Sequence, residues 1–284
     1  MIDLARPREV APGLSLFSAR TPTLPPATHT NSYALGGREI VLIEPATPYA
    51  DEQKEWLAWA KSLRLNGGGL KAIVPTHHHP DHVGGIDVLA RELNVPIWAH
   101  EETAKRVQAP VDRFLNDGDE IVLGGPTPQR WKVLLTPGHA PVHLCFHEPE
   151  INALVVGDMV ASIGTILIAP GEGHMGTYLA QLSRLATIGA GVGLPAHGDP
   201  IATPTTLFER YIAHRLLREQ KVKRALEAFG ESGATLSELV PTAYDDTPKE
   251  IWTIAELSLA AHLEKLVEEG AVRQVEHRYT VAIA

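Results

Sequence analysis

The chain has 284 residues, of which 44% are apolar, and a formal net charge of −9. This length suits two domains, and the apolar share is ample for their cores. No apolar run approaches the roughly 18 residues of a membrane helix, and residues 1–17 lack a basic segment followed by an apolar one. We therefore expect a cytoplasmic protein without a membrane span. The single cysteine, Cys145, excludes an internal disulfide, and the negative charge argues against long-range attraction to nucleic acid.

The first two thirds of the chain alternate short apolar runs with amphipathic segments, which predicts a mixed α/β domain. Strands are expected at 32–35, 40–43, 72–74, 97–99, 120–122, 131–135, 143–147 and 153–156. Helices are expected at 49–65, 87–93 and 178–188. The glycine run at 189–193 is not read as a nucleotide-binding loop, because no strand precedes it and no helix follows it.

The last 80 or so residues change to nearly continuous helix, expected at 205–229, 235–240 and 248–269, and end in an alternating segment, 272–283, typical of a hairpin. Helices followed by a two-stranded wing predict a winged-helix domain. We therefore place the domain boundary between residues 203 and 204, giving domains 1–203 and 204–284.

The charge of the C-terminal domain bears on its role. Residues 204–284 hold ten Lys or Arg against thirteen Asp or Glu. This balance favours a structural module, or one that forms a homodimer, over a nucleic-acid-binding module. The exception is a basic cluster on the long helix, made of Arg215, Arg218, Lys221, Lys223 and Arg224.

A dense set of metal-binding side chains follows the strand at 72–74, where residues 76–82 read Thr-His-His-His-Pro-Asp-His. Imidazole and carboxylate together suit Zn²⁺ and its first-row neighbours, whereas Ca²⁺ or Mg²⁺ would be held by oxygen alone. Pro80 disfavours helical dihedrals at the residue before it and suits a first helical turn. We therefore expect His77 and His79 on a loop, and Asp81 and His82 at the start of a helix.

The motif needs partners, because a two-metal site takes about six or seven protein ligands. Three later segments offer them, each after an apolar run and a turn. These segments are Thr-Pro-Gly-His ending at His139, Val-Gly-Asp ending at Asp158, and Leu-Pro-Ala-His-Gly containing His197.

The order H-x-H-x-D-H, followed by a distant His, Asp and His, resembles the metallo-β-lactamase fold superfamily of metal-dependent hydrolases. The resemblance implies a four-layer αββα fold over the first 200 or so residues and two adjoining divalent metal sites. It places His77, His79 and His139 on the first metal, Asp81, His82 and His197 on the second, and Asp158 between them.

Two residues depart from the family pattern. His78 has no place in it and is interpreted as a spectator. The family usually has an aspartate near the end of the second strand, where this chain has Glu44. A longer carboxylate there can still accept a hydrogen bond from a ligand imidazole, although its reach differs by one methylene.

The later segments Gly157–Val160, Ile168–Pro170, Met175–Leu179 and Tyr211–Arg215, together with the winged-helix tail, resemble the β-lactamase-like protein 2 subgroup. Members of that subgroup and its close relatives include single-strand-specific endoribonucleases and thioesterases that release acyl chains from carrier proteins. The resemblance therefore implies a small-molecule or acyl-thioester substrate, with RNA as the other candidate.

The expected chemistry is the same for each substrate. Two divalent cations about 3.5 to 4 Å apart lower the pKa of a shared water to about 7 and hold the hydroxide against a carbonyl or phosphorus. Zn²⁺ is expected, with Mn²⁺ or Fe²⁺ as alternatives, because affinity order and cellular supply both intervene. Asp81 and Asp158 are assigned to catalysis through the metals. Tyr178 and, behind it, His174 are the candidates for protonating the leaving group.

Three functions remain open. The leading hypothesis is a dinuclear hydrolase that uses a metal-bridging hydroxide on a carboxylic ester, thioester or lactone. The alternative is a single-strand endoribonuclease, against which the acidic balance counts. The third is a non-catalytic metal-binding regulator, although a structural zinc site would close with four ligands. A mono-iron oxygenase would leave Asp81, His82 and His197 without a metal. Of the other histidines, His29 is a candidate for substrate contact, while His143 and His147 are expected to be packing or surface residues.

Overall fold

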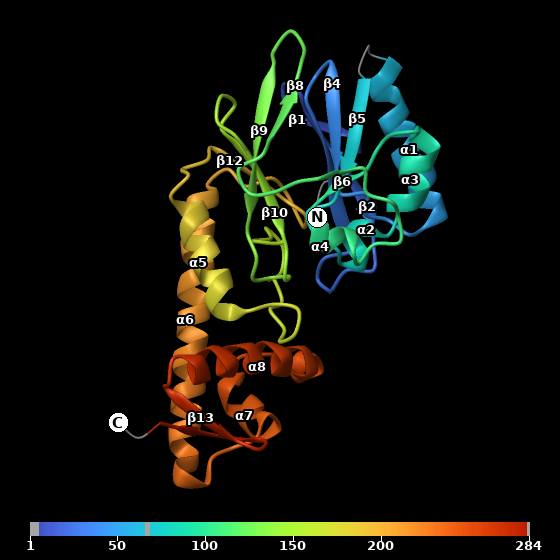
Figure 1. Cartoon of the computed structure of the whole chain (residues 1–284). Helices are drawn as coiled ribbons and strands as arrows, with labels where there is room; N and C mark the ends of the chain where they lie inside the picture. The colour runs from blue at the N-terminus through green and yellow to red at the C-terminus, as the bar shows by residue number, and fades with distance from the viewer. Residues whose placement is uncertain (1–5, 66–68, 283–284) are drawn as a thin grey trace. The chain divides into compact units, whose positions relative to one another are not determined.

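The computed structural model describes residues 6–65 and 69–282 (Figure 1). These residues form two compact units. The first contains the described residues up to Thr136, together with 142–165 and 190–204. The second contains 137–141, 166–189 and the described residues from 205 onward. The sequence-based boundary between residues 203 and 204 stays a prediction.

Two five-stranded sheets form the frame of the first unit. One has the order β1 (Arg8–Ala11), β2 (Leu14–Arg20), β3 (His29–Leu35), β4 (Glu39–Ile43), β5 (Gly69–Val74). The other has the order β12 (Val192–Pro195), β11 (Ala153–Gly157), β10 (Leu144–Glu148), β9 (Gln129–Leu135), β8 (Glu120–Leu123). Pairing is antiparallel except between β4 and β5 and between β11 and β12. A parallel pair needs a crossover, and α1 (Ala50–Leu65) supplies the one between β4 and β5.

The main core of the first unit lies between its two sheets. Leu16 and Val41 of the first sheet belong to one buried cluster with Trp131 and Phe146 of the second. The outer face of the first sheet is covered by α1 and α3 (Ile86–Leu93), as Figure 1 shows. The remaining elements are small: α2 (Pro80–Val83), α4 (Glu101–Ala104), and the paired strands β6 (Trp98–Ala99) and β7 (Arg113–Phe114).

The carboxyl ends of β4, β5, β11 and β12 meet at one edge of this frame. The backbone N–H of Leu144, at the start of β10, donates to Thr76 O, after β5, across 2.9 Å. The N–H of Asn31, in β3, donates to Ala196 O, after β12, across 2.8 Å. Because these bonds join one sheet to the other, side chains that follow β4, β5, β11 and β12 are held near one another.

The second unit is mainly helical. Its elements are α5 (Met175–Ala186), α6 (Pro204–Phe229, which begins in the first unit), η1 (Gly230–Ser232), α7 (Leu236–Ala243), η2 (Lys249–Ile251), α8 (Trp252–Glu268), and the antiparallel hairpin of β13 (Val272–Val275) and β14 (Arg278–Val281). The core of this unit includes Leu226, Leu239, Leu259 and Leu263. A capping box between Thr235 and Glu238 starts α7. Helices followed by a hairpin wing agree with the architecture expected from the sequence.

The elements predicted from the sequence are all present, with ends that differ by a few residues. The predicted hairpin extended to Ile283, which lies outside the described residues. The prediction missed the short elements α4, β7 and η1 and the sheet strands β1, β2 and β12. The last of these reads Val-Gly-Leu-Pro, and glycine and proline are both disfavoured in strands. Within the part of the chain that the structure describes, no helix is long and apolar enough to cross a membrane.

Candidate metal centre

The histidine-rich segment adopts the predicted loop and helix. His79 is the residue before α2 and has extended backbone dihedrals, φ −63° and ψ 148°, as expected for a residue that precedes proline. His77 and His79 lie on the loop after β5, and Asp81 and His82 lie in α2. The two pairs of side chains thus approach from different backbone directions.

Four of the predicted ligands converge in the first unit. Atoms of Asp81, His82 and His197 lie within 4.8 Å of one another. Asp158, which follows β11, closes the group: its Oδ2 is 3.5 Å from His82 Nε2, and its Oδ1 is 3.3 Å from His197 Nε2. Asp81 lies 3.8 Å from His82 Nε2 and 3.6 Å from His197 Nε2.

This geometry fits a bound cation. The Nε2 atom of His82 is buried and has no hydrogen-bond partner among the residues that the structure describes. The separations of 3.3 to 3.8 Å are longer than ordinary hydrogen bonds. They are close to the roughly 3.3 Å expected between donor atoms on a tetrahedral Zn²⁺ with bonds of about 2.0–2.1 Å. Two imidazoles and two carboxylates are also a suitable donor set for a first-row metal.

The electrostatics of the group also favour positive charge. Burial by itself lowers the pKa of His82, but the carboxylates of Glu44, Asp158 and Asp81 outweigh burial and hold that pKa well above its ordinary value. Burial raises the pKa of the Asp158 carboxyl, yet the His197 and His82 imidazoles hold it well below its usual range. Carboxylates that attract a proton to an imidazole so strongly also attract a metal cation to the same place.

Hydrogen bonds fix which nitrogen each histidine turns toward the group. The Nδ1 atom of His197 lies 3.0 Å from the carbonyl oxygen of His29. A carbonyl can only accept, so Nδ1 carries the proton and Nε2 carries the lone pair. His82 is held in the same way by Glu44, at 3.0 Å from Nδ1 to Oε1. His29, considered for substrate contact, thus contributes its backbone to the position of a predicted ligand.

Glu44 makes the hydrogen bond to an imidazole that its place in the sequence suggested. Its side chain is 1% exposed, and its Oε1 accepts hydrogen bonds from Thr76 Oγ1 at 2.6 Å and from His82 Nδ1 at 3.0 Å. Its Oε2 accepts from the Thr76 N–H at 3.2 Å. The backbone of Glu44 has φ +59°, an uncommon value for a residue with a side chain. The extra methylene is therefore accommodated, and the carboxylate reaches the imidazole.

The other predicted ligands are found in two places. His77 is fully buried, and its Nε2 lies 2.9 Å from Nδ1 of His79. His139 belongs to the second unit, where its Nδ1 lies 3.0 Å from Leu167 O, so its lone pair is on Nε2. The membership of His77, His79 and His139 in one site remains a prediction. The Nε2 atom of His78 lies 3.2 Å from Arg106 Nη1.

The candidates for the leaving-group acid are both in the second unit. Tyr178 is fully buried, with the Arg215 guanidinium carbon 5.9 Å from its ring centroid. His174 caps α5: its Nδ1 accepts from the Thr177 N–H at 3.1 Å, and its Nε2 lies 2.7 Å from Glu268 Oε2. His174 is thus engaged in local structure.

Reasoning from the sequence missed one further residue at the centre, His143. It was expected to be a packing residue, and it is indeed fully buried. However, its Nε2 lies 3.1 Å from the backbone nitrogen of Asp158 and its ring centroid lies 5.2 Å from that of His77. Alternation of His143 with Cys145 in a strand-like segment suggested only burial, because the contact with Asp158 depends on the pairing of β10 with β11.

Comparison with known proteins shows the family to which the chain belongs. A model of the metallo-beta-lactamase superfamily matches residues 25–199, and a model of the beta-lactamase associated winged helix domain matches residues 235–279. Lactamase-like protein vrtG of Penicillium aethiopicum is 30% identical over 273 residues, which cover 93% of this chain and 84% of that protein. A beta-lactamase-like protein 2 homolog of Caenorhabditis elegans is 29% identical over 251 residues, with 86% and 80% covered.

Solved structures give the same answer for the fold. A metallo-beta-lactamase family protein from Thermus thermophilus superposes with a TM-score of 0.78 at 26% identity, covering 96% of this chain and all of that one. A beta-lactamase domain protein from Burkholderia ambifaria gives a TM-score of 0.82 at 21% identity, with 99% and 95% covered. The predicted fold class is confirmed: the chain belongs to the metallo-β-lactamase superfamily of metal-dependent hydrolases and carries the winged-helix domain associated with it.

Proposed function

We propose that this hydrolase is dinuclear and acts on a carboxylic ester, thioester or lactone. The observation that carries the proposal is the convergence of Asp81, His82, Asp158 and His197, in which the carboxylate oxygens lie 3.3 to 3.8 Å from the imidazole Nε2 atoms. Asp158, which lies near Nε2 of both His82 and His197, would share the cation that these imidazoles hold, and its assignment to the second cation as well follows from the family pattern.

The ligand sets follow from this arrangement. Asp81, His82 and His197 would hold one cation, and His77, His79 and His139 the other, most simply as Zn²⁺, with Mn²⁺ or Fe²⁺ as alternatives. When bound, two such cations supply a water nucleophile at neutral pH and stabilise the developing oxyanion. In the set of His77, His79 and His139, the first two lie together on the loop before α2, whereas His139 is included on the strength of the family pattern.

The chain's own residues orient these groups. Glu44 directs Nε2 of His82 toward the site, and the backbone of His29 does the same for His197. Asp81 and Asp158 provide the negative charge that offsets the cations. The complete burial of Tyr178 gives no support to its predicted role as leaving-group acid. A thioester suits such a site best, because its thiolate leaving group is weakly basic and needs less help from an acid than the alkoxide of an ester or lactone does.

The endoribonuclease alternative receives less support. Three members of the basic cluster on α6 are paired with acids of the same unit: Arg218 lies 2.9 Å from Asp246, Lys221 lies 2.7 Å from Asp245, and Lys223 lies 3.7 Å from Glu219. Charges already offset in this way add little attraction for a phosphate backbone.

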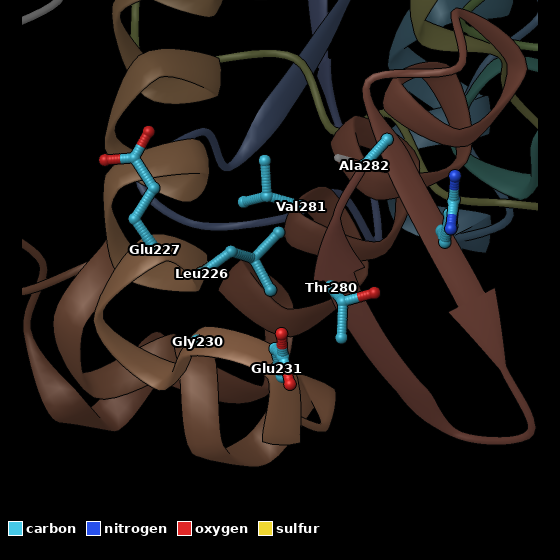
Figure 2. Close-up of a pocket in the computed structure, with 8 residues that line it drawn as sticks. Leu226, Glu227, Gly230, Glu231, Thr280, Val281 and Ala282 are labelled. Carbon is cyan, nitrogen blue, oxygen red and sulfur yellow. The ribbon is translucent and has the colours of Figure 1, made fainter. Parts of the chain in front are cut away.

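A hollow beside the wing is also unsuited to RNA. Figure 2 shows this pocket, a cavity of about 490 Å³ whose lining includes Leu226, Glu227, Glu231, Arg273 and Val281. Two carboxylates against one guanidinium would repel a phosphate backbone rather than attract it. The described surface of the winged-helix region thus fits a structural role better than strand binding.

A side-by-side substrate panel tests the proposal. Metal-loaded protein should hydrolyse a thioester or a lactone faster than a β-lactam or single-stranded RNA, and elemental analysis should find close to two transition-metal equivalents per chain. His79→Ala and Asp158→Ala should each abolish that turnover, whereas His277→Ala, at an exposed position in the wing, should not. Turnover retained in either site variant, or one stable iron equivalent with oxygen consumption, would overturn the proposal.

A further inference from the structure

We propose that His143 is a positioning residue that fixes the backbone of Asp158, and through it the carboxylate that would lie between the two cations of the proposed function. This inference rests on the proposed function of the same site. His143 is not part of the ligand set that the family pattern implies, and the alternation of its segment pointed only to packing.

The first step is the protonation pattern of the ring. The backbone nitrogen of Asp158 is a donor, and it lies 3.1 Å from His143 Nε2, so Nε2 must accept and must carry a lone pair. The proton of the neutral ring is then on Nδ1, which lies 2.9 Å from Thr136 Oγ1 and donates to it. The ring therefore bridges the residue after β9 and the residue after β11.

The second step excludes a ligand role for His143. Its ring centroid is 5.2 Å from that of His77, close enough to suggest membership in the histidine cluster. The lone pair on Nε2 is directed to the Asp158 N–H, however, and Nδ1 is protonated, so neither nitrogen has a lone pair for a metal. His143 can only act through the groups that it holds.

The third step is the close fit around the ring. Gly157, the last residue of β11 and the one before Asp158, has φ +49°, and a Cβ added there would lie 2.5 Å from His143 Nε2. A residue with a side chain would thus need both a disfavoured backbone conformation and room that the imidazole occupies. The glycine lets the imidazole approach the turn closely enough to accept a hydrogen bond from the Asp158 N–H. This bond fixes the position of the Asp158 backbone, from which the carboxylate side chain extends.

A pair of variants separates positioning from packing. In His143→Gln the side-chain oxygen can reach the place of Nε2 and accept the Asp158 N–H, whereas in His143→Asn the amide reaches only the place of Nδ1. We expect His143→Asn to lose metal to a competing chelator about tenfold or more easily than the wild type and His143→Gln to resemble the wild type. With the best substrate of the panel, kcat should fall in His143→Asn with little change in KM.

A further variant covers the case in which His143→Asn does not fold. Thr136→Val keeps the side-chain shape but removes the acceptor for Nδ1–H, so it should weaken metal retention in the same direction. His147→Asn, in β10, is the matched control and should leave metal retention unchanged.

The outcomes are distinct. Equal metal retention in the wild type, His143→Asn and Thr136→Val overturns the inference, as does an equal loss in His143→Gln and His143→Asn. If no substrate is hydrolysed by the wild type but the Gln and Asn variants still differ in metal retention, the proposed function fails while the positioning role stands.

Discussion

Glu44 and His82 are joined by a buried hydrogen bond in which the imidazole Nδ1 donates to the carboxylate Oε1 across 3.0 Å. The same carboxylate oxygen accepts from Thr76 Oγ1, which in turn lies 2.9 Å from Nδ1 of His77. One glutamate thus reaches His82 directly and His77 through a hydroxyl. These two histidines belong to different metals in the proposed ligand sets, so Glu44 links the two sites.

Replacement of Glu44 should therefore weaken the binding of both metals. Partners of ligand imidazoles typically contribute about 10- to 100-fold to metal affinity, so we expect that loss in Glu44→Ala, measured as metal equivalents retained against a graded chelator. Glu44→Asp, one methylene shorter, should fall between the wild type and Glu44→Ala. The matched control is Glu92→Ala on the exposed face of α3. Loss of only one equivalent in Glu44→Ala would contradict the link.

Gly157 gives a second test, because two separate features exclude a side chain there. Its φ of +49° is unfavourable for other residues, and an added Cβ would lie 2.5 Å from His143 Nε2. We expect Gly157→Ala to lower the free energy of unfolding by about 1–3 kcal/mol, measured by urea denaturation. Gly37→Ala should change it little, because an added Cβ meets no described atom within 4 Å. The double variant Gly157→Ala/His143→Ala should lose less than the sum of the two single losses, since His143→Ala removes the collision with the added Cβ but not the backbone strain.

The local part of the site could be predicted because it follows from neighbouring residues. His77, His79, Asp81 and His82 lie within six consecutive positions, and Pro80 alone sets where the loop ends and the helix begins. Asp158 was recognisable because it directly follows a buried, strand-like run. In each case the metal-binding side chain and the strand or helix that positions it are adjacent in the chain.

The supporting interactions could not be predicted, because they depend on strand order and pairing. The bond from His82 to Glu44 joins residues 38 positions apart, and the bond between Asp158 and His143 joins residues 15 apart. Their geometry arises only when β4 pairs with β5 and β10 with β11. The strand β12 escaped prediction for a different reason: glycine and proline take up half of it, and burial against β11 overrides their poor strand propensity.

The wing of the winged-helix region is tied to the helices by Arg278. Its Nε donates to Ser232 O at 2.9 Å, its Nη2 donates to Gly233 O at 2.8 Å, and Nη2 also lies 3.1 Å from Glu238 Oε2. The Arg278 and Glu238 side chains are each 44% exposed, so their ion pair adds little to stability. The hydrogen bonds to the two carbonyls should therefore contribute most of the stabilisation. We expect Arg278→Ala to destabilise the hairpin by about 1 kcal/mol, seen as faster hydrogen exchange in β13 and β14. Arg273→Ala, at an exposed position in β13, is the control; an equal effect in both variants would show that Arg278 has no special role.

His262 makes the stability of the second unit depend on pH. It is fully buried in α8, and neither ring nitrogen has a hydrogen-bond partner among residues 6–65 and 69–282. Burial, reinforced by the positive charges of Arg215 and Lys265, lowers the pKa of His262 to about 3. The unfolded chain has an ordinary histidine there, with a pKa of about 6.5.

The sign of the pH effect follows from these two values. Above a pH of about 6.5 both states are neutral at His262, so the group adds no pH dependence. Below that pH the unfolded state binds a proton that the folded state does not bind until about pH 3, so stability falls as the pH falls. The slope approaches about 1.4 kcal/mol per pH unit, which gives a loss of about 2 kcal/mol between pH 8 and pH 5.

Hydrogen exchange of the α8 amides at pH 8, 6 and 5, corrected for the intrinsic exchange rate, measures this slope. His262→Leu should remove most of it and should stabilise the unit at pH 5, because an apolar side chain replaces two polar atoms that have no partner among the described residues. His277→Leu, at an exposed position in the wing, should leave the slope as it is. An unchanged slope in His262→Leu would show that the acid sensitivity of this unit arises from other groups.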